Sequence, residues 1–289
     1  MRFHCAESMT KIEYYVPLAK AVEEMGYHGF VMGDSLIYPK ASDTAYSYTE
    51  DGGREFLENK AFVESFILAT AILTATTKLE VTSNVIKLPV RPPLYSAKLA
   101  SSVAALSGNR FNFGVGLSVW PEDYEVMGVP YAKRGKRFDE CLEIVKGLCA
   151  GGYFEYHGEF YDLPAVKLNP VPSKPIPLLI GGHSDAAFKR AAKYDGFMFA
   201  GGGIDVLKPM VDAINGYRAE LGRQDKPFQL FATQIGKVTV DSVRQMEDLG
   251  VTDMPVVFRN VYAVEEDTQT LQEKLDSYAR FADEVISKL

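Results

Sequence analysis

Short apolar runs alternate along the chain with longer segments that carry apolar residues at helical spacing. Runs that are apolar throughout are typical of buried parallel strands, and recurrence every three to four residues is typical of amphipathic helices. We predict strands over residues 2–6, 30–32, 79–83, 111–114, 177–180, 197–200, 228–232 and 254–258. We predict helices over residues 11–25, 60–76, 92–106, 131–149, 185–194, 206–221, 240–249 and 268–286.

This alternation of strand and helix predicts parallel βαβ units with right-handed crossovers. A chain of 289 residues has the usual length of an α/β barrel, so we predict one (β/α)8 TIM-barrel domain over residues 1–289. Two insertions interrupt the pattern. The first is a polar loop, residues 35–58, after the second strand. The second, residues 151–174, follows the fourth helix and carries a hairpin over residues 153–161.

Charge, cysteine content and hydropathy indicate which partners and which compartment the sequence suits. The net charge of −7 gives no basic field that would attract a nucleic acid. Cys5, Cys141 and Cys149 are scattered and form no C-x-x-C pair, which is typical of a protein of the reducing cytoplasm. The most apolar run, residues 61–76, contains Glu64 and is shorter than a membrane span, so we predict no membrane partner.

In a barrel of this kind the chemistry lies at the carboxyl ends of the strands. Gly181, Gly182, His183 and Ser184 follow the fifth predicted strand. Glycines there allow close backbone approach, and the free N–H groups of a helix start attract an anion. The same residues also suit an ordinary tight turn in which Ser184 caps the helix.

Three further residues are candidates for the chemistry. Asp34 directly follows the second strand, where its carboxylate could accept a hydrogen bond from a ring edge or cap a turn. Trp120 and Glu122 lie in the loop that we predict after the fourth strand, and Trp120 could wall a substrate pocket or pack in the core. We predict Asp34, Trp120 and Glu122 as the catalytic residues. Histidines do not occur at metal-ligand spacing, so we predict no metal site.

The segment 106–140 combines a glycine pair, an acidic loop and a basic helix start. Gly114 and Gly116 allow the backbone to approach something flat or bulky. The helix that we expect from about Pro130 begins with four cations, which oppose the helix dipole. They form either a solvated face or a cluster that faces an anion. These cations are Lys133, Arg134, Lys136 and Arg137.

The same segment resembles the bacterial luciferase-like family of flavin and deazaflavin oxidoreductases. The family pattern is met by residues 106–110 (LSGNR), 114–116 (GVG), 121–124 (PEDY), 128–130 (GVP) and 134–137 (RGKR). The likeness continues through Arg190 and, more loosely, over nearly the whole chain. It implies a TIM barrel, a cofactor phosphate at residues 181–184, and a non-proline cis peptide that falls at Asn84–Val85.

The resemblance also implies the cofactor and its contacts. The implied cofactor-binding residues are Asp34, Ser83, Asn84, Val85, Gly116, Arg134, Arg137, Gly181, Gly182, His183 and Ser184. We predict a homodimeric F420-dependent oxidoreductase that transfers a hydride between this deazaflavin and a small organic substrate. An FMN-dependent luciferase-like monooxygenase is the alternative. A non-catalytic flavin-binding barrel is the alternative of another class.

Two positions depart from patterns within that family. Deazaflavin-using relatives often have aspartate followed by histidine where this chain has Asp34 and Ser35, which argues against a histidine-based proton relay. Some sugar-phosphate dehydrogenases of the family have glutamate directly after the second glycine. Leu117 stands at that position here, which argues against such a substrate.

Overall fold

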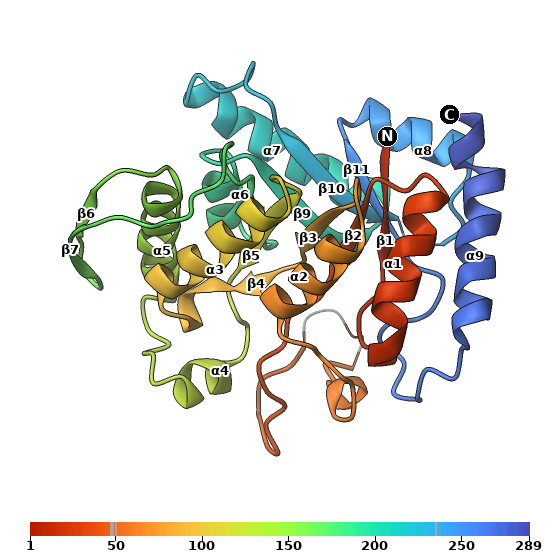
Figure 1. Cartoon of the computed structure of the whole chain (residues 1–289), viewed down its shortest axis with the longest axis horizontal. Coiled ribbons are helices and arrows are strands. Elements are labelled where there is room, and N and C mark those ends of the chain that lie inside the picture. Colours follow the sequence, from red (N-terminus) through yellow and green to blue (C-terminus); the bar gives the residue numbers. More distant parts are fainter. Residues whose placement is uncertain (47–48, 50, 235) are drawn as a thin grey trace.

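A computed structural model shows a closed barrel of parallel strands surrounded by helices (Figure 1). The structure describes residues 1–46, 49, 51–234 and 236–289. The barrel strands are β1 (Arg2–Ala6), β2 (Gly29–Met32), β3 (Glu80–Ser83), β5 (Phe111–Gly116), β8 (Leu178–Gly181), β9 (Gly196–Gly202), β10 (Gln229–Gln234) and β11 (Asp253–Val256). They pair in the order β3-β2-β1-β11-β10-β9-β8-β5, and pairing of β3 with β5 closes the barrel. The predicted TIM-barrel fold is confirmed.

Every predicted strand and helix is present; the first strand has the predicted ends and the other elements have shifted ends. The helices are α1 (Tyr15–Glu24), α2 (Ser65–Ala75), α3 (Pro93–Leu106), α4 (Pro121–Val126), α5 (Arg134–Cys149), α6 (Asp185–Ala191), α7 (Ile204–Glu220), α8 (Val240–Asp248) and α9 (Leu271–Glu284). The additional strands are β4 (Ile86–Lys87), β6 (Phe154–His157) and β7 (Asp162–Val166). The 3-10 helices are η1 (Ile12–Tyr14), η2 (Glu55–Leu57), η3 (Leu88–Val90) and η4 (Ile286–Lys288).

Helix α2 begins later than the sequence predicts. The side chain of Glu64 accepts hydrogen bonds from the backbone N–H groups of Phe66 and Ile67 at 2.8 and 3.0 Å. This cap fixes the first turn at Ser65 and leaves residues 60–64 outside the helix. Apolar content alone had extended the predicted helix over them.

Two predictions for the chain after β5 are wrong. The loop expected around Trp120 contains the short helix α4, which Pro121 begins at a position that proline favours. Helix α5 begins at Arg134 instead of near Pro130, because Lys133 takes the left-handed backbone conformation with a φ of 56°. One of the four cations therefore precedes the helix.

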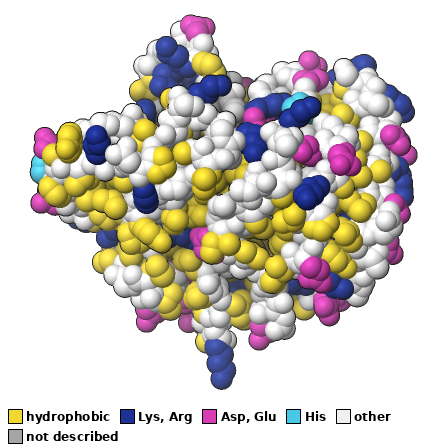
Figure 2. Space-filling model, viewed as in Figure 1, with side chains coloured by type: hydrophobic (Ala, Val, Ile, Leu, Met, Phe, Trp, Pro, Cys, Tyr) yellow, Lys and Arg dark blue, Asp and Glu magenta, His cyan; other side chains and the backbone are white. Residues whose placement is uncertain are grey.

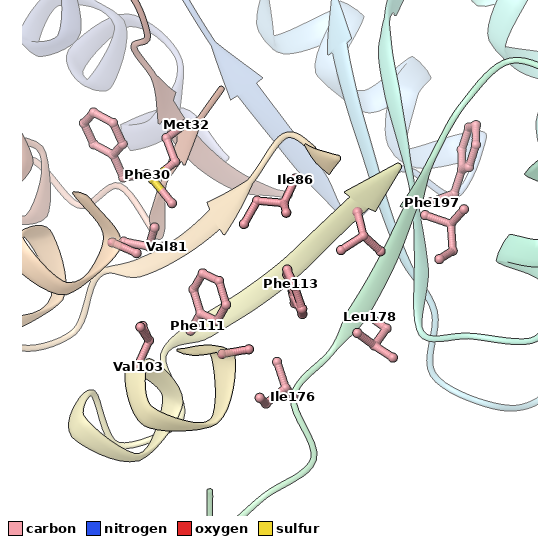
Figure 3. Close-up of a cluster of buried hydrophobic side chains, with 14 of the residues drawn as sticks. Phe30, Met32, Val81, Ile86, Val103, Phe111, Phe113, Ile176, Leu178 and Phe197 are labelled. Atoms are coloured by element: carbon pink, nitrogen blue, oxygen red, sulfur yellow. The ribbon is translucent and has the colours of Figure 1, made fainter. Parts of the chain in front are cut away.

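Phenylalanine and branched aliphatic side chains fill the layer between the strands and the helices, as Figure 3 shows around β5. The ring of Phe66 on α2 packs 6.0 Å from that of Phe111 and 5.6 Å from that of Phe113, measured between ring centroids. Each fully buried ring contributes about 1.5–3 kcal/mol. These contacts fix α2 against the strand whose end leads into the candidate site.

A second apolar cluster faces the interior of the barrel. It consists of Val31, Leu179, Met198 and Phe231. Val31 and Leu179 each lie between residues that pack outward, so strand alternation turns them inward. Ala6 and Val85 pack on this cluster, which therefore supports the chain at the carboxyl ends of the strands.

The two predicted insertions lie on different sides of the barrel. The loop 35–58 contains η2, and it extends with α4 beyond the barrel at the lower edge of Figure 1. Ser47, Tyr48 and Glu50 of this loop lie outside the described residues. A hairpin is present in the second insertion as the antiparallel pair β6–β7, but it extends beyond the predicted residues 153–161, because its second strand is Asp162–Val166. Glu140 on α5 accepts hydrogen bonds from the backbone N–H groups of residues 159–161, which fixes the hairpin turn to that helix.

Candidate functional site

A cavity of about 310 Å³ lies at the carboxyl ends of the barrel strands. This volume is at the lower end of the range for small-molecule sites. Since catalysis in this architecture occurs at that end of the barrel, we take the cavity as the candidate active site. Its lining includes Ala6, Gly33, Asn84, Leu117, Ala200, Thr233 and Pro255, each near the end of a barrel strand.

The structure brings only part of the predicted site to this cavity. Asp34, Asn84, Val85 and Trp120 belong to its lining. The predicted site residues outside the lining are Ser83, Gly116, Glu122, Arg134, Arg137, Gly181, Gly182, His183 and Ser184. The Ser83 hydroxyl points to β5, where it donates a 2.8 Å hydrogen bond to the carbonyl of Gly114.

Asp34 is a buried ion-pair partner. Its Oδ1 accepts from Arg91 Nη2 at 2.7 Å and from the Ser65 hydroxyl at 2.9 Å. Its Oδ2 accepts from Arg91 Nη1 at 3.0 Å and from the backbone N–H of Lys87 at 3.1 Å. Both oxygens are thus held by protein donors, which differs from the expectation of a carboxylate open to a cofactor ring.

Lys87 reaches a second acid on the other side. Its Nζ lies 2.7 Å from Oδ2 of Asp123, and the side chains of Lys87 and Asp123 are only 12% and 1% exposed. The Ser118 hydroxyl donates to the same carboxylate and accepts from the backbone N–H of Trp120 at 3.1 Å. Lys87, Ser118 and Trp120 all line the cavity, so this chain of contacts forms part of its wall.

The peptide bond between Asn84 and Val85 is cis, as the family resemblance implied. Val85 then packs between two glycines. A Cβ on Gly116 would lie 2.7 Å from one Val85 methyl, and a Cβ on Gly181 would lie 2.9 Å from the other. Larger residues at either position would therefore displace Val85 from the cavity. In this structure the two glycines make room for the protein's own side chain.

Aromatic rings cover the cavity on the side of the long loop. Tyr46 stacks on Trp120 with ring centroids 5.5 Å apart and planes 6° from parallel. Phe56 and Tyr262 pack against Tyr46 at 5.4 and 6.2 Å, and all four rings line the cavity. The guanidinium of Arg54 lies 5.1 Å from the Trp120 ring. The predicted placement of Trp120 in a pocket wall is therefore consistent with this geometry.

Glu122 lies next to the wall but outside it. The residue is half-buried, and its Oε2 has no hydrogen-bond partner within the described part of the chain. Its neighbour Asp123 makes the contact to Lys87 instead. A catalytic role for Glu122 stays a prediction.

The glycine turn after β8 has a backbone suited to close approach. Gly182 has a φ of 140°, and a Cβ there would lie 2.8 Å from that of Ala187. Ser184 caps α6 by accepting from the backbone N–H of Ala187 at 3.3 Å. His183 is exposed, with its ring 5.7 Å from that of Phe199. Next to this turn, the paired strand β9 also ends in glycines with positive φ.

The basic helix start is used largely by the protein itself. Arg137 is buried, donates to the carbonyl of Pro130 at 2.7 Å and stacks 4.4 Å from the Phe160 ring. Lys133 and Lys136 both pair with Glu159 of the hairpin. Arg134 stacks 3.9 Å from the ring of Tyr131 and has no acidic partner among residues whose placement is described.

Sequence reasoning missed several site residues. Arg91 and Lys87 come from the short segment after β3, and Ser118 and Asp123 come from the segment after β5. Ser8 lines the cavity and its hydroxyl accepts from the backbone N–H of Gly33 at 2.7 Å. The available signal was position alone, since all of these residues lie in segments that directly follow barrel strands.

Among the described residues, no three His, Cys, Asp or Glu side chains are grouped so that they could hold a metal ion. The three cysteines are buried and free, and burial raises the pKa of the Cys141 thiol to about 12. Within the same described ranges, none of the helices has both the length and the apolar character that crossing a membrane requires.

The chain belongs to the luciferase-like monooxygenase family, whose pattern matches residues 3–278. The resemblance noted from the sequence is therefore confirmed. An uncharacterised protein of Mycobacterium tuberculosis is 51% identical over 289 residues, which is 100% of both chains.

Two solved structures share the fold at low identity. The monooxygenase RslO1 from Streptomyces bottropensis matches with a TM-score of 0.76 at 13% identity, over 100% of this chain and 99% of that one. The coenzyme F420 dependent tetrahydromethanopterin reductase from Methanopyrus kandleri also has a TM-score of 0.76, at 14% identity over 99% of each chain. The solved structures that share this fold therefore include a monooxygenase and an F420-dependent reductase.

Proposed function

We propose that this protein is an F420-dependent oxidoreductase that transfers a hydride between the deazaflavin and a small organic substrate. The observation that carries the proposal is the position of Val85. Gly116 and Gly181 leave room for it at the base of the cavity, so an apolar surface supports whatever lies above. A flat, uncharged ring system fits such a surface better than an ionic ligand does.

Each part of the site would have a separate task. A bound deazaflavin would supply the hydride chemistry. Val85 and Leu117 would support its ring, and the backbone N–H groups near Gly182 and Ser184 would hold its phosphate. Tyr46 and Trp120 would close the cavity over the cofactor and the substrate and exclude water.

Two alternatives make different use of the same cavity. FMN in place of F420 would make the protein a flavin-dependent monooxygenase, as the family name suggests. A barrel that binds flavin without catalysis would need no group directed at a substrate. The buried Lys87–Asp123 pair beside the cavity favours an enzyme over that second alternative, because such pairs are costly unless they serve a purpose.

The test uses Trp120, the only tryptophan of the chain, as the reporter. Oxidised and reduced F420 and FMN are titrated separately into the protein, and both indole emission and cofactor absorbance are followed. We expect F420 to bind at least tenfold more tightly than FMN, about 1.4 kcal/mol. Tighter binding of FMN would support the monooxygenase, and no binding of either would support the non-catalytic barrel.

We also propose that the protein acts as a cytoplasmic homodimer. Figure 2 shows hydrophobic side chains gathered over α2 and α3. On these helices Ile67, Tyr95 and Leu106 are 65%, 60% and 70% exposed. A second copy would remove this apolar surface from water. Light scattering after gel filtration of wild type and of Ile67→Glu tests the assignment, since the charge should shift a dimer to monomer.

A further inference from the structure

Lys87 is the one cation among the described residues that line the cavity. Its side chain is 12% exposed, and an ammonium has three N–H donors. Asp123 is its one hydrogen-bond partner within the described chain. Two donors of a largely buried ammonium therefore remain for a ligand oxygen.

Hydrogen bonds of the Lys87 backbone hold in place the segment that carries this ammonium. The N–H of Lys87 donates to Asp34 at 3.1 Å, and its carbonyl accepts from Arg91 Nη1 at 3.3 Å. Arg91 and Asp34 bind each other as well, so the three residues form a closed set of contacts. Lys87 is thus held at the cavity by groups that are not themselves free to bind substrate.

The ammonium is also tied to the aromatic wall. Asp123 receives both Lys87 Nζ and the Ser118 hydroxyl, and that hydroxyl accepts from the backbone N–H of Trp120. The stacked rings of Trp120 and Tyr46 both line the same cavity. These contacts therefore hold the Lys87 ammonium at a fixed position relative to the Trp120 and Tyr46 rings.

We propose that Lys87 binds an oxygen of the substrate, and that the substrate is a planar aromatic compound with a phenolic or enolic oxygen. The inference rests on the proposed function for the presence of a substrate. Packing against the Trp120 and Tyr46 rings that line the cavity selects a planar aromatic compound. The Lys87 ammonium stabilises negative charge on the oxygen, an effect that is strong where water is excluded.

The test compares two probes that differ in one oxygen. 4-Nitrophenolate carries the charge, and 4-nitroanisole has the same ring with a methylated oxygen. Both are titrated into the full chain without cofactor, and quenching of Trp120 emission reports binding in the cavity. We expect Lys87→Met to weaken phenolate binding at least tenfold, about 1.4 kcal/mol, and to change 4-nitroanisole binding less than twofold.

Two further variants control for a general effect of charge and for loss of folding. Lys208→Met removes an exposed lysine paired with Asp212 and should change neither affinity. Lys87→Met combined with Asp123→Asn removes the carboxylate left unpaired, so a folded protein without the ammonium is available even if the single variant unfolds.

The proposal is overturned by equal losses for both probes, by an unchanged phenolate affinity, or by no phenolate binding to the wild type. None of these outcomes depends on F420. A protein that binds the phenolate through Lys87 but neither cofactor would overturn the proposed function and leave this inference intact.

Discussion

Arg91 binds Asp34 through two parallel hydrogen bonds, from Nη2 to Oδ1 at 2.7 Å and from Nη1 to Oδ2 at 3.0 Å. A carboxylate held in this way is neutralised and oriented. Because Asp34 also accepts from the backbone of Lys87, the pair fixes the chain that follows the cis peptide. The Arg91–Asp34 pair thereby fixes the backbone of Lys87, the residue whose ammonium we propose as the ligand-binding group.

Replacement of Arg91 by Met should destabilise the protein strongly. The Asp34 side chain is 2% exposed, so loss of its partner leaves a buried charge unpaired. Such a loss costs about 3–5 kcal/mol. The free energy of unfolding from urea titration measures it.

The matched control is Lys208→Met, which breaks an ion pair whose side chains are 58% and 62% exposed. That change should stay within about 0.5 kcal/mol. If the free energy of unfolding fell by similar amounts in the two variants, the Arg91–Asp34 pair would contribute no more to stability than an exposed ion pair does.

The strands of this barrel were predictable because a strand that is buried on both faces is apolar at nearly every position. Residues 30–32 and 197–200 are apolar without interruption, and each forms part of a barrel strand. The ends of α2 and α5 were not predictable from that pattern. A Glu64 cap and the left-handed backbone of Lys133 decide them, and neither changes apolar periodicity.

The candidate site was only partly predictable for a similar reason. The position of Asp34 and Trp120 followed from strand ends and from family likeness. Their partners did not, since Arg91 lies 57 residues from Asp34, and Asp123 lies 36 from Lys87. Only the closed barrel brings these segments together, so no local pattern could show which charge would be neutralised.

The stability contributed by Asp267 should depend on pH. Its Oδ2 lies 2.7 Å from Lys274 Nζ. Burial alone raises the pKa of this carboxyl, but Lys274 and further donors outweigh it and hold the pKa below its usual value. Pairing therefore stabilises the fold above about pH 4, and this contribution disappears as pH falls through the folded-state pKa.

We expect Asp267→Asn to cost about 1.5–3 kcal/mol at neutral pH, the range for a hydrogen bond to a charged group. The difference from wild type should shrink below about pH 4. Urea titrations across this pH range measure it, with Asp212→Asn at an exposed pair as the control. A difference that persists unchanged in acid would mean that Asp267 acts through packing instead of charge.

Gly182→Val should weaken cofactor binding at least tenfold, about 1.4 kcal/mol. A side chain there meets Ala187 and must adopt a backbone conformation that side chains rarely take. Gly216→Ala is the control, because a Cβ at that exposed helix position has nothing within 4 Å. It should leave affinity unchanged and stabilise the protein by about 0.5–1 kcal/mol. Wild-type affinity in a folded Gly182→Val protein would remove the turn from the site.

We expect Arg134 to contribute to cofactor binding and Arg137 to contribute to the stability of the fold. F420 carries an acidic tail beyond its phosphodiester, whereas FMN carries one compact phosphate. Arg134 has no acidic partner in the described chain, so it can meet such a tail. Arg134→Ala should weaken F420 by up to about 1 kcal/mol, roughly fivefold. The loss should be smaller for FMN and should decrease as salt screens the charge.

Arg137→Ala should instead lower stability by about 1.5–3 kcal/mol, since it removes a charged donor from the Pro130 carbonyl and exposes the Phe160 ring. Its effect on affinity should be the same for both cofactors. Lys20→Ala, an exposed cation on α1, serves as the control for net charge. Titrations of F420 and FMN at low and high salt, paired with urea unfolding, measure both effects. Equal losses for the two cofactors in Arg134→Ala at every salt concentration would show that this cluster does not bind the tail.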